Sequence, residues 1–132
     1  MTHEEQEDRI RAVCAKWREV LGLDEWEINL CYRDGQYVKG DGGASDQAIA
    51  STDVQWEYRR AQIYFRIDLL ADEDDAELEA VFVHEAMHVL LNSQRPINGA
   101  DSAVGREYER LFEEHTATTL ARAFLRAKEM QP

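Results

Sequence analysis

The sequence predicts an α+β fold in a single domain that spans residues 1–132. Apolar residues recur at helical spacing near both ends of the chain, and alternating apolar and polar residues between them predict strands. The segment 80–91 reads AVFVHEAMHVLL, which is apolar on nearly every side of a helix. Because a chain of 132 residues with 44% hydrophobic content can bury about two thirds of its unfolded surface, one core is sufficient.

The first element is expected to be a helix from Thr2 to Leu21. Its apolar residues fall at i, i+3, i+4, i+7, i+10 and i+11, which places them in one stripe. Thr2 and Glu5 can form a capping box at its start, and Gly22 can end it. The stripe consists of Ile10, Val13, Cys14, Trp17, Val20 and Leu21.

Three strands are expected in the middle of the chain, and apolar residues recur at alternate positions in the first and the third. They are residues 26–32, 48–58 and 61–68. Glycines and aspartates predict a loop over 33–47, and a turn near Arg59 and Arg60 joins the second strand to the third. The large aromatic residues expected in the core are Trp26, Trp56 and Phe65.

Two helices are expected after the strands. The acidic run 72–75 favours a helix start, because carboxylates stabilise the positive end of the helix dipole. This helix should continue to about Asn92 and end before Pro96 and Gly99. A second loop then leads into a final helix over 106–128.

Composition excludes some classes of function. A net charge of -12 and a pI near 4.7 argue against nucleic-acid or membrane-surface binding, because both partners would be repelled. Cys14 and Cys31 form no CxxC pair, so a reducing, cytoplasmic location is expected. The acidic N-terminus is unlike a secretory signal, and no apolar run is long enough for a membrane span.

The HExxH sequence at 84–88 is the strongest functional signal. Two buried imidazoles and a buried carboxylate without partners would each cost about 1–3 kcal/mol. His84 and His88 are four residues apart, so their Cβ atoms lie about 5–6 Å apart on one helix face, close enough to bind one tetrahedral ion. Glu85 lies about 100° further round the helix, beside a water held by such an ion. The pattern therefore predicts one Zn²⁺ per chain, with Glu85 as general base.

A catalytic zinc usually has three protein ligands, so a third is expected from elsewhere in the chain. Glu114 is the favoured candidate, because on a helical wheel it lies in an apolar, small-residue stripe of the last helix. His115 and Glu107 remain alternatives, and His3 lies at the terminus. Glu113 falls on another side of the same wheel. That stripe contains Leu111, Glu114, Thr118, Ala121 and Leu125, with Ala117 at its margin.

The HExxH motif followed by a helical glutamate resembles the gluzincin metallopeptidases. The small size and an expected three-strand meander before the zinc helix resemble minigluzincins and phage-type metallopeptidases. The residues around Glu114 are similar to the E-x-x-A-x-x-F-A-x-x-L-L pattern of ImmA/IrrE-type peptidases. The matching positions are Glu114, Ala117, Leu120, Ala121, Phe124 and Leu125. The resemblance implies a zincin-like order of N-terminal helix, three-stranded sheet, HExxH helix and C-terminal glutamate helix.

The function implied is a zinc-dependent peptidase that hydrolyses a peptide or protein substrate through a metal-activated water. In zincins of this layout the edge strand before the zinc helix pairs with an extended substrate, and here that strand would be Ala61–Asp68. Tyr108 and His115 are candidates for assisting the oxyanion. One alternative is a zincin-scaffold binding or inhibitory module, phage-derived or latent. Separately, Cys14 or Cys31 could occupy the fourth zinc position as a latency switch. Another is a metal-free domain in which HExxH is accidental.

Overall fold

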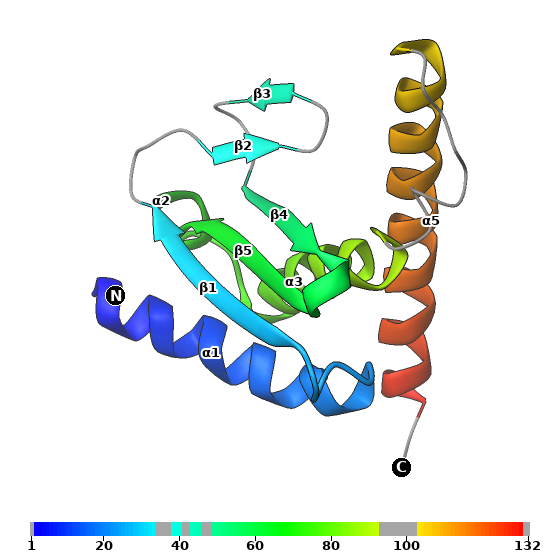
Figure 1. The fold of residues 1–132 in the computed structure, drawn as a ribbon. Coiled ribbons are helices and arrows are strands. Elements are labelled where there is room, and N and C mark those ends of the chain that lie inside the picture. The colour runs from blue at the N-terminus through cyan, green and yellow to red at the C-terminus, as the bar shows by residue number, and fades with distance from the viewer. Residues whose placement is uncertain (1, 34–37, 41–42, 46–48, 93–102, 131–132) are drawn as a thin grey trace.

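The computed structural model describes residues 2–33, 38–40, 43–45, 49–92 and 103–130, with the backbone alone for 38–40, 43–45, 103 and 104. It has the expected α+β class, with helices around a three-stranded sheet (Figure 1). In chain order the helices and strands are α1 (His3–Val20), β1 (Glu27–Arg33), β2 (Val38–Gly40), β3 (Gly43–Ser45), β4 (Ala50–Gln55), the 3-10 helix η1 (Trp56–Tyr58), β5 (Arg60–Arg66), α2 (Ile67–Leu70), α3 (Asp75–Leu91) and α5 (Ala103–Glu129).

The strand order of the main sheet is β1-β5-β4, with β1 parallel and β4 antiparallel to β5. The expected meander is therefore wrong, because parallel neighbours such as β1 and β5 cannot be joined by a tight turn. The expectation that Ala61–Asp68 forms an edge strand is also wrong. Its residues 61–66 belong to β5, which pairs with β4 along one edge and with β1 along the other, and its inward residues Ala61, Ile63 and Phe65 are fully buried. In the described sheet the outer strands are β1 and β4.

One face of this sheet is covered by α1 and α3, and α5 packs along α3 (Figure 1). The core lies between these layers, where the stripe of α1 meets the inward residues of β5. Trp17 and Phe65 are both fully buried there, as is Phe82 from α3. One side of α3 therefore packs on the core, and its other side, which carries His84 and His88, contacts α5.

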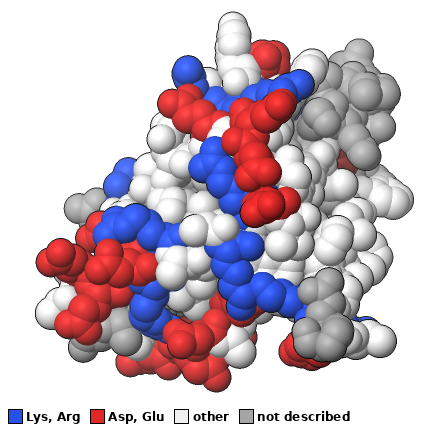
Figure 2. All heavy atoms as spheres, turned by 90° about the horizontal axis from the view of Figure 1, so that it is seen from below, with Lys and Arg blue, Asp and Glu red and all other residues white. Residues whose placement is uncertain are grey.

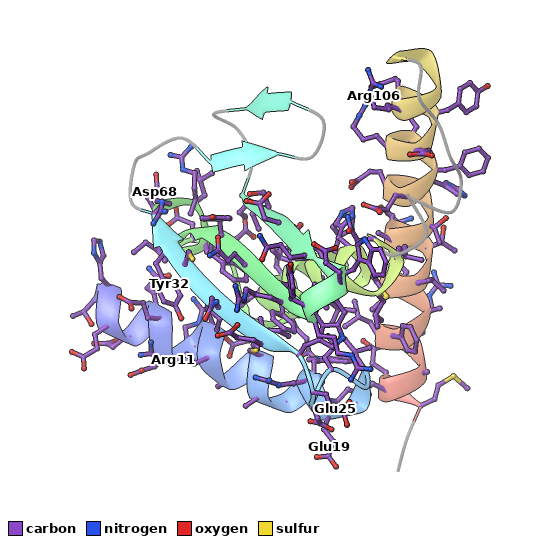
Figure 3. All side chains as sticks on the ribbon, viewed as in Figure 1. Arg11, Glu19, Glu25, Tyr32, Asp68 and Arg106 are labelled. Carbon is purple, nitrogen blue, oxygen red and sulfur yellow. The ribbon has the colours of Figure 1, made fainter. Side chains whose placement is uncertain are left out.

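The strand ends differ from the expectation. The second strand stops at Gln55, and Trp56 lies in η1 with 41% of its surface exposed, so its expected place in the core is wrong. The cause is a tight turn at Arg59, whose φ of 52° is left-handed and takes the chain directly into β5. Glu25, labelled in Figure 3 near the end of α1, forms an ion pair with Arg59 at this turn. Phe65 is buried as expected, and Trp26 is partly buried against the core.

Two other segments also differ. The third strand ends at Arg66, because Ile67–Leu70 form the short helix α2 and bury Ile67 and Leu70 against the core. The expected loop 33–47 contains a short antiparallel ladder between β2 and β3.

The helix starts follow the expected capping chemistry. The Thr2 hydroxyl accepts a hydrogen bond from the Glu5 amide at 3.1 Å, and the Asp74 carboxylate accepts one from the Glu77 amide at 2.8 Å. Gly22 follows α1 with a φ of 72°, a conformation that glycine adopts without strain. The last helix starts at Ala103, slightly earlier than expected. Pro96 and Gly99, expected to end the preceding helix, lie outside the described residues.

The surface charge is mixed despite the net charge of -12. On the face that carries α1, acidic and basic side chains are interspersed (Figure 2). Pairs such as Arg9–Asp75 at 3.0 Å and Arg11–Asp8 at 2.5 Å account for part of this mixing. No helix in the described part of the chain is long and apolar enough to cross a membrane.

Candidate metal centre

His84 and His88 project from one face of α3, one turn apart. Their Nε2 atoms are 3.3 Å apart, and the ring centroids are separated by 5.0 Å at an interplanar angle of 74°. The neighbours Val83, Ala86 and Met87 are fully buried, so packing on the other sides of α3 determines which way the imidazoles point. His88 has 4% of its side chain exposed, whereas His84 has 24%. His88 is therefore in the interior, and His84 is closer to the surface.

Glu114 on α5 approaches both imidazoles. Its Oε1 lies 2.8 Å from His84 Nε2, and its Oε2 lies 3.2 Å from His88 Nε2. Ala117 and Ala121, both buried, have side chains small enough for α5 to pack closely on α3. The hydrogen bond from His84, then that from His88, holds the pKa of Glu114 well below its usual range, although burial opposes the shift. The carboxylate is therefore anionic at neutral pH.

These three side chains fit a tetrahedral metal ion. Ligands about 2.0–2.1 Å from such an ion lie about 3.3 Å from one another. The observed separation of 3.3 Å between the two Nε2 atoms matches this value, and the contacts of Glu114 at 2.8 and 3.2 Å come near it. Donor atoms of His84, Glu85 and His88 also lie within 4.8 Å of one another. Glu114 completes the set better than Glu85, because Glu114 touches both Nε2 atoms.

Glu113 has a role that the sequence did not indicate. Its Oε2 lies 2.9 Å from His88 Nδ1, and the two side chains are only 6% and 4% exposed. The helical wheel placed Glu113 away from the site, but α5 turns a broader face to α3, so Glu113 and Glu114 contact opposite nitrogens of one imidazole. The sequence did contain a signal for this position of Glu113: Glu113, Ala117 and Ala121 recur every fourth residue and so share one face of the helix.

Glu85 lies beside the imidazole pair and contacts the sheet. The Thr52 hydroxyl on β4 donates a hydrogen bond of 2.7 Å to Glu85 Oε1, and both residues have 7% of their surface exposed. The offset of Glu85 from the face of His84 and His88 is the one expected from helical geometry. Thr52 was not expected to belong to the site.

The alternative third ligands lie elsewhere. Glu107 is exposed and pairs with Arg110 at 2.7 Å, and His115 is exposed. Neither has an observed contact with His84 or His88 among the described residues. Tyr108, a candidate for assisting the oxyanion, is 63% exposed. Cys14 is a free thiol buried in the core, and burial raises its pKa.

A cleft of about 430 Å³ opens beside His84 and Glu85, between α3 and α5. Ile49, Val81 and Leu125 provide apolar lining. The cleft therefore lies directly beside the candidate metal ligands, and its lining combines apolar with polar side chains.

Comparisons with protein-family models, curated proteins and solved structures found no match to this chain.

Proposed function

We propose that this chain is a zinc-dependent peptidase with a zincin-like fold, in which His84, His88 and Glu114 bind one Zn²⁺ and Glu85 is the general base. One observation carries the proposal. Two Nε2 atoms and a carboxylate converge within 2.8–3.3 Å, beside a second carboxylate and a cleft.

Zinc is the metal that this donor set favours. Two neutral imidazoles with one carboxylate form a three-ligand set of the kind found in catalytic zinc sites, which leave a fourth position open. Harder cations such as Mg²⁺ and Ca²⁺ favour all-oxygen sites instead. When bound, Zn²⁺ supplies Lewis acidity and lowers the pKa of water.

The chain itself supplies the proton transfer and the orientation of groups. Glu85 accepts a proton from the attacking water and delivers it to the leaving amine. Glu113 accepts the Nδ1–H of His88, which leaves the Nε2 lone pair of His88 free to bind the metal. The cleft lined by Val81 and Leu125 takes an apolar part of the peptide.

An extended substrate would pair with β4 rather than with β5. β5 is paired on both edges, whereas β4 is an outer strand of the described sheet and carries Thr52 next to Glu85. The proposed partner is therefore a peptide or protein.

We propose a cytoplasmic location for the protein itself, because both of its cysteines are free thiols.

Glu85→Gln tests the enzymatic assignment. The change keeps the shape of the side chain and removes the base, so zinc content and melting temperature should stay near those of the wild type. Cleavage of a responsive peptide from a broad library should fall about 10²- to 10⁴-fold. Glu129→Gln, at the exposed end of α5, is the matched control and should cleave normally. Equal cleavage by wild type and Glu85→Gln would refute the mechanism.

A zinc-loaded wild type that cleaves no peptide would instead favour the binding or inhibitory module. Elemental analysis of protein purified without chelators distinguishes these outcomes from a metal-free domain. Absence of zinc, together with no thermal shift when zinc is added, would contradict the metal site itself.

A further inference from the structure

Thr52 is an unusual residue for its position in the sheet. It faces inward from β4, where it lies opposite Ile63 of β5, and Val54 on the same side of β4 packs against the core. An apolar side chain would be expected here. Instead, Thr52 is 7% exposed, and its hydroxyl lies 2.7 Å from Glu85 Oε1 and 3.4 Å from the Glu85 carbonyl oxygen. The hydroxyl therefore has a specific partner on α3.

A buried carboxylate needs hydrogen bonds, because burying the charge without them strongly destabilises the folded protein. The contact from Thr52 has the short length of a hydrogen bond from a hydroxyl to a charged oxygen. Glu85 also has a flexible side chain with three rotatable bonds, and one directed bond to a rigid strand removes much of that freedom. The Thr52 contact thus restrains the carboxylate as well as solvating it.

We propose that Thr52 is a positioning residue for the catalytic base: it anchors Glu85 Oε1 to the sheet and so sets the carboxylate at the angle needed for proton transfer. This inference rests on the proposed peptidase function. A base that is displaced by about 1 Å can lose about 10²-fold in rate, so anchoring is worth a measurable part of kcat.

Thr52→Val tests the anchor, because valine has nearly the same shape and lacks the hydroxyl. We expect kcat on a cleaved library peptide to fall about 10- to 100-fold, with KM within about twofold, because Thr52 acts on the base. The zinc Kd, measured by chelator competition, should also stay within about twofold, because Thr52 touches no ligand atom. Thr52→Ser restores the hydroxyl and should recover most of kcat. Thr119→Val makes the same change at an exposed position of α5 and should leave kcat unchanged.

A double substitution separates positioning from a merely structural role. In a Glu85→Gln background, Thr52→Val should cause little further loss of kcat, because the base that it positions is already gone. A structural role would instead give a loss of kcat that persists in both backgrounds. Unchanged kcat in Thr52→Val, while Glu85→Gln is inactive, would overturn the inference and leave the peptidase proposal intact. A zinc-bound wild type that cleaves nothing would overturn both.

Discussion

Helix α3 makes two junctions with other helices, and charged side chains lie at different depths in them. Toward α1, Glu79 accepts hydrogen bonds from Trp17 Nε1 at 2.7 Å and Lys16 Nζ at 3.1 Å. The Lys16 and Glu79 side chains are 47% and 21% exposed. Toward α5, His88 and Glu113 meet at 2.9 Å with 4% and 6% exposed. The first junction has its charges at the rim of an apolar contact, and the second has them in its interior.

The difference is between a junction that depends on apolar packing and one that depends on paired buried charges. Exposed ion pairs contribute about 0–1 kcal/mol, so apolar side chains such as Trp17 hold α1 in place. Buried charged groups are costly unless each is paired, so the junction of α3 and α5 is stable only with a complete set of partners. A bound cation would stabilise this second junction more than the first.

The largest expected effect follows from removing one ligand of the proposed metal site. Glu114→Ala removes the side chain that contacts both Nε2 atoms and should weaken zinc binding more than 10²-fold, beyond the usual cost of losing an orienting partner. Chelator competition measures the Kd. Glu107→Ala, on the exposed part of the same helix, should keep the wild-type Kd. If His115→Ala empties the site instead, the ligand set proposed here is wrong.

A smaller effect is expected from the carboxylate behind His88. Glu113→Gln keeps an acceptor for the His88 Nδ1–H but removes the charge, and Glu113→Ala removes both. Zinc affinity should fall by about 10- to 100-fold in Glu113→Ala and by less in Glu113→Gln. Competition titrations with the two variants side by side measure this order. Equal affinities for wild type and Glu113→Ala would show that Glu113 does not orient the ligand.

The smallest effect is expected at the rim of the α1 junction. Lys16→Ala removes the exposed ion pair with Glu79. It also removes a like charge beside Lys128, whose pKa is lowered by burial and by the Lys16 ammonium. The free energy of unfolding, from urea denaturation, should change by less than about 1 kcal/mol, and zinc affinity should not change. If Lys16→Ala lowered zinc affinity as much as Glu113→Ala does, the contrast between the two junctions would be contradicted.

The predicted parts of the fold are those set by local rules. Helical spacing and capping residues placed α1 and α3 within a residue or two, because both act within one turn. The pairing of the strands was mistaken, because alternation identifies a strand without identifying its neighbours. β5 therefore proved central rather than an edge strand. Trp56 was misplaced because β4 ends at Gln55, and the chain enters the 3-10 helix η1 at Trp56 before it reaches the turn at Arg59.

In the candidate site too, local features were predictable from the sequence and long-range contacts were not. The sequence alone determined that His84 and His88 share a helix face with Glu85 beside them, because four residues make about one turn of a helix. It also favoured Glu114 among the residues of the last helix. Only the tertiary structure decided that Glu113 lies behind His88 and that Thr52 contacts Glu85. Both contacts join elements that are distant along the chain, and their geometry depends on how α5 and β4 pack against α3.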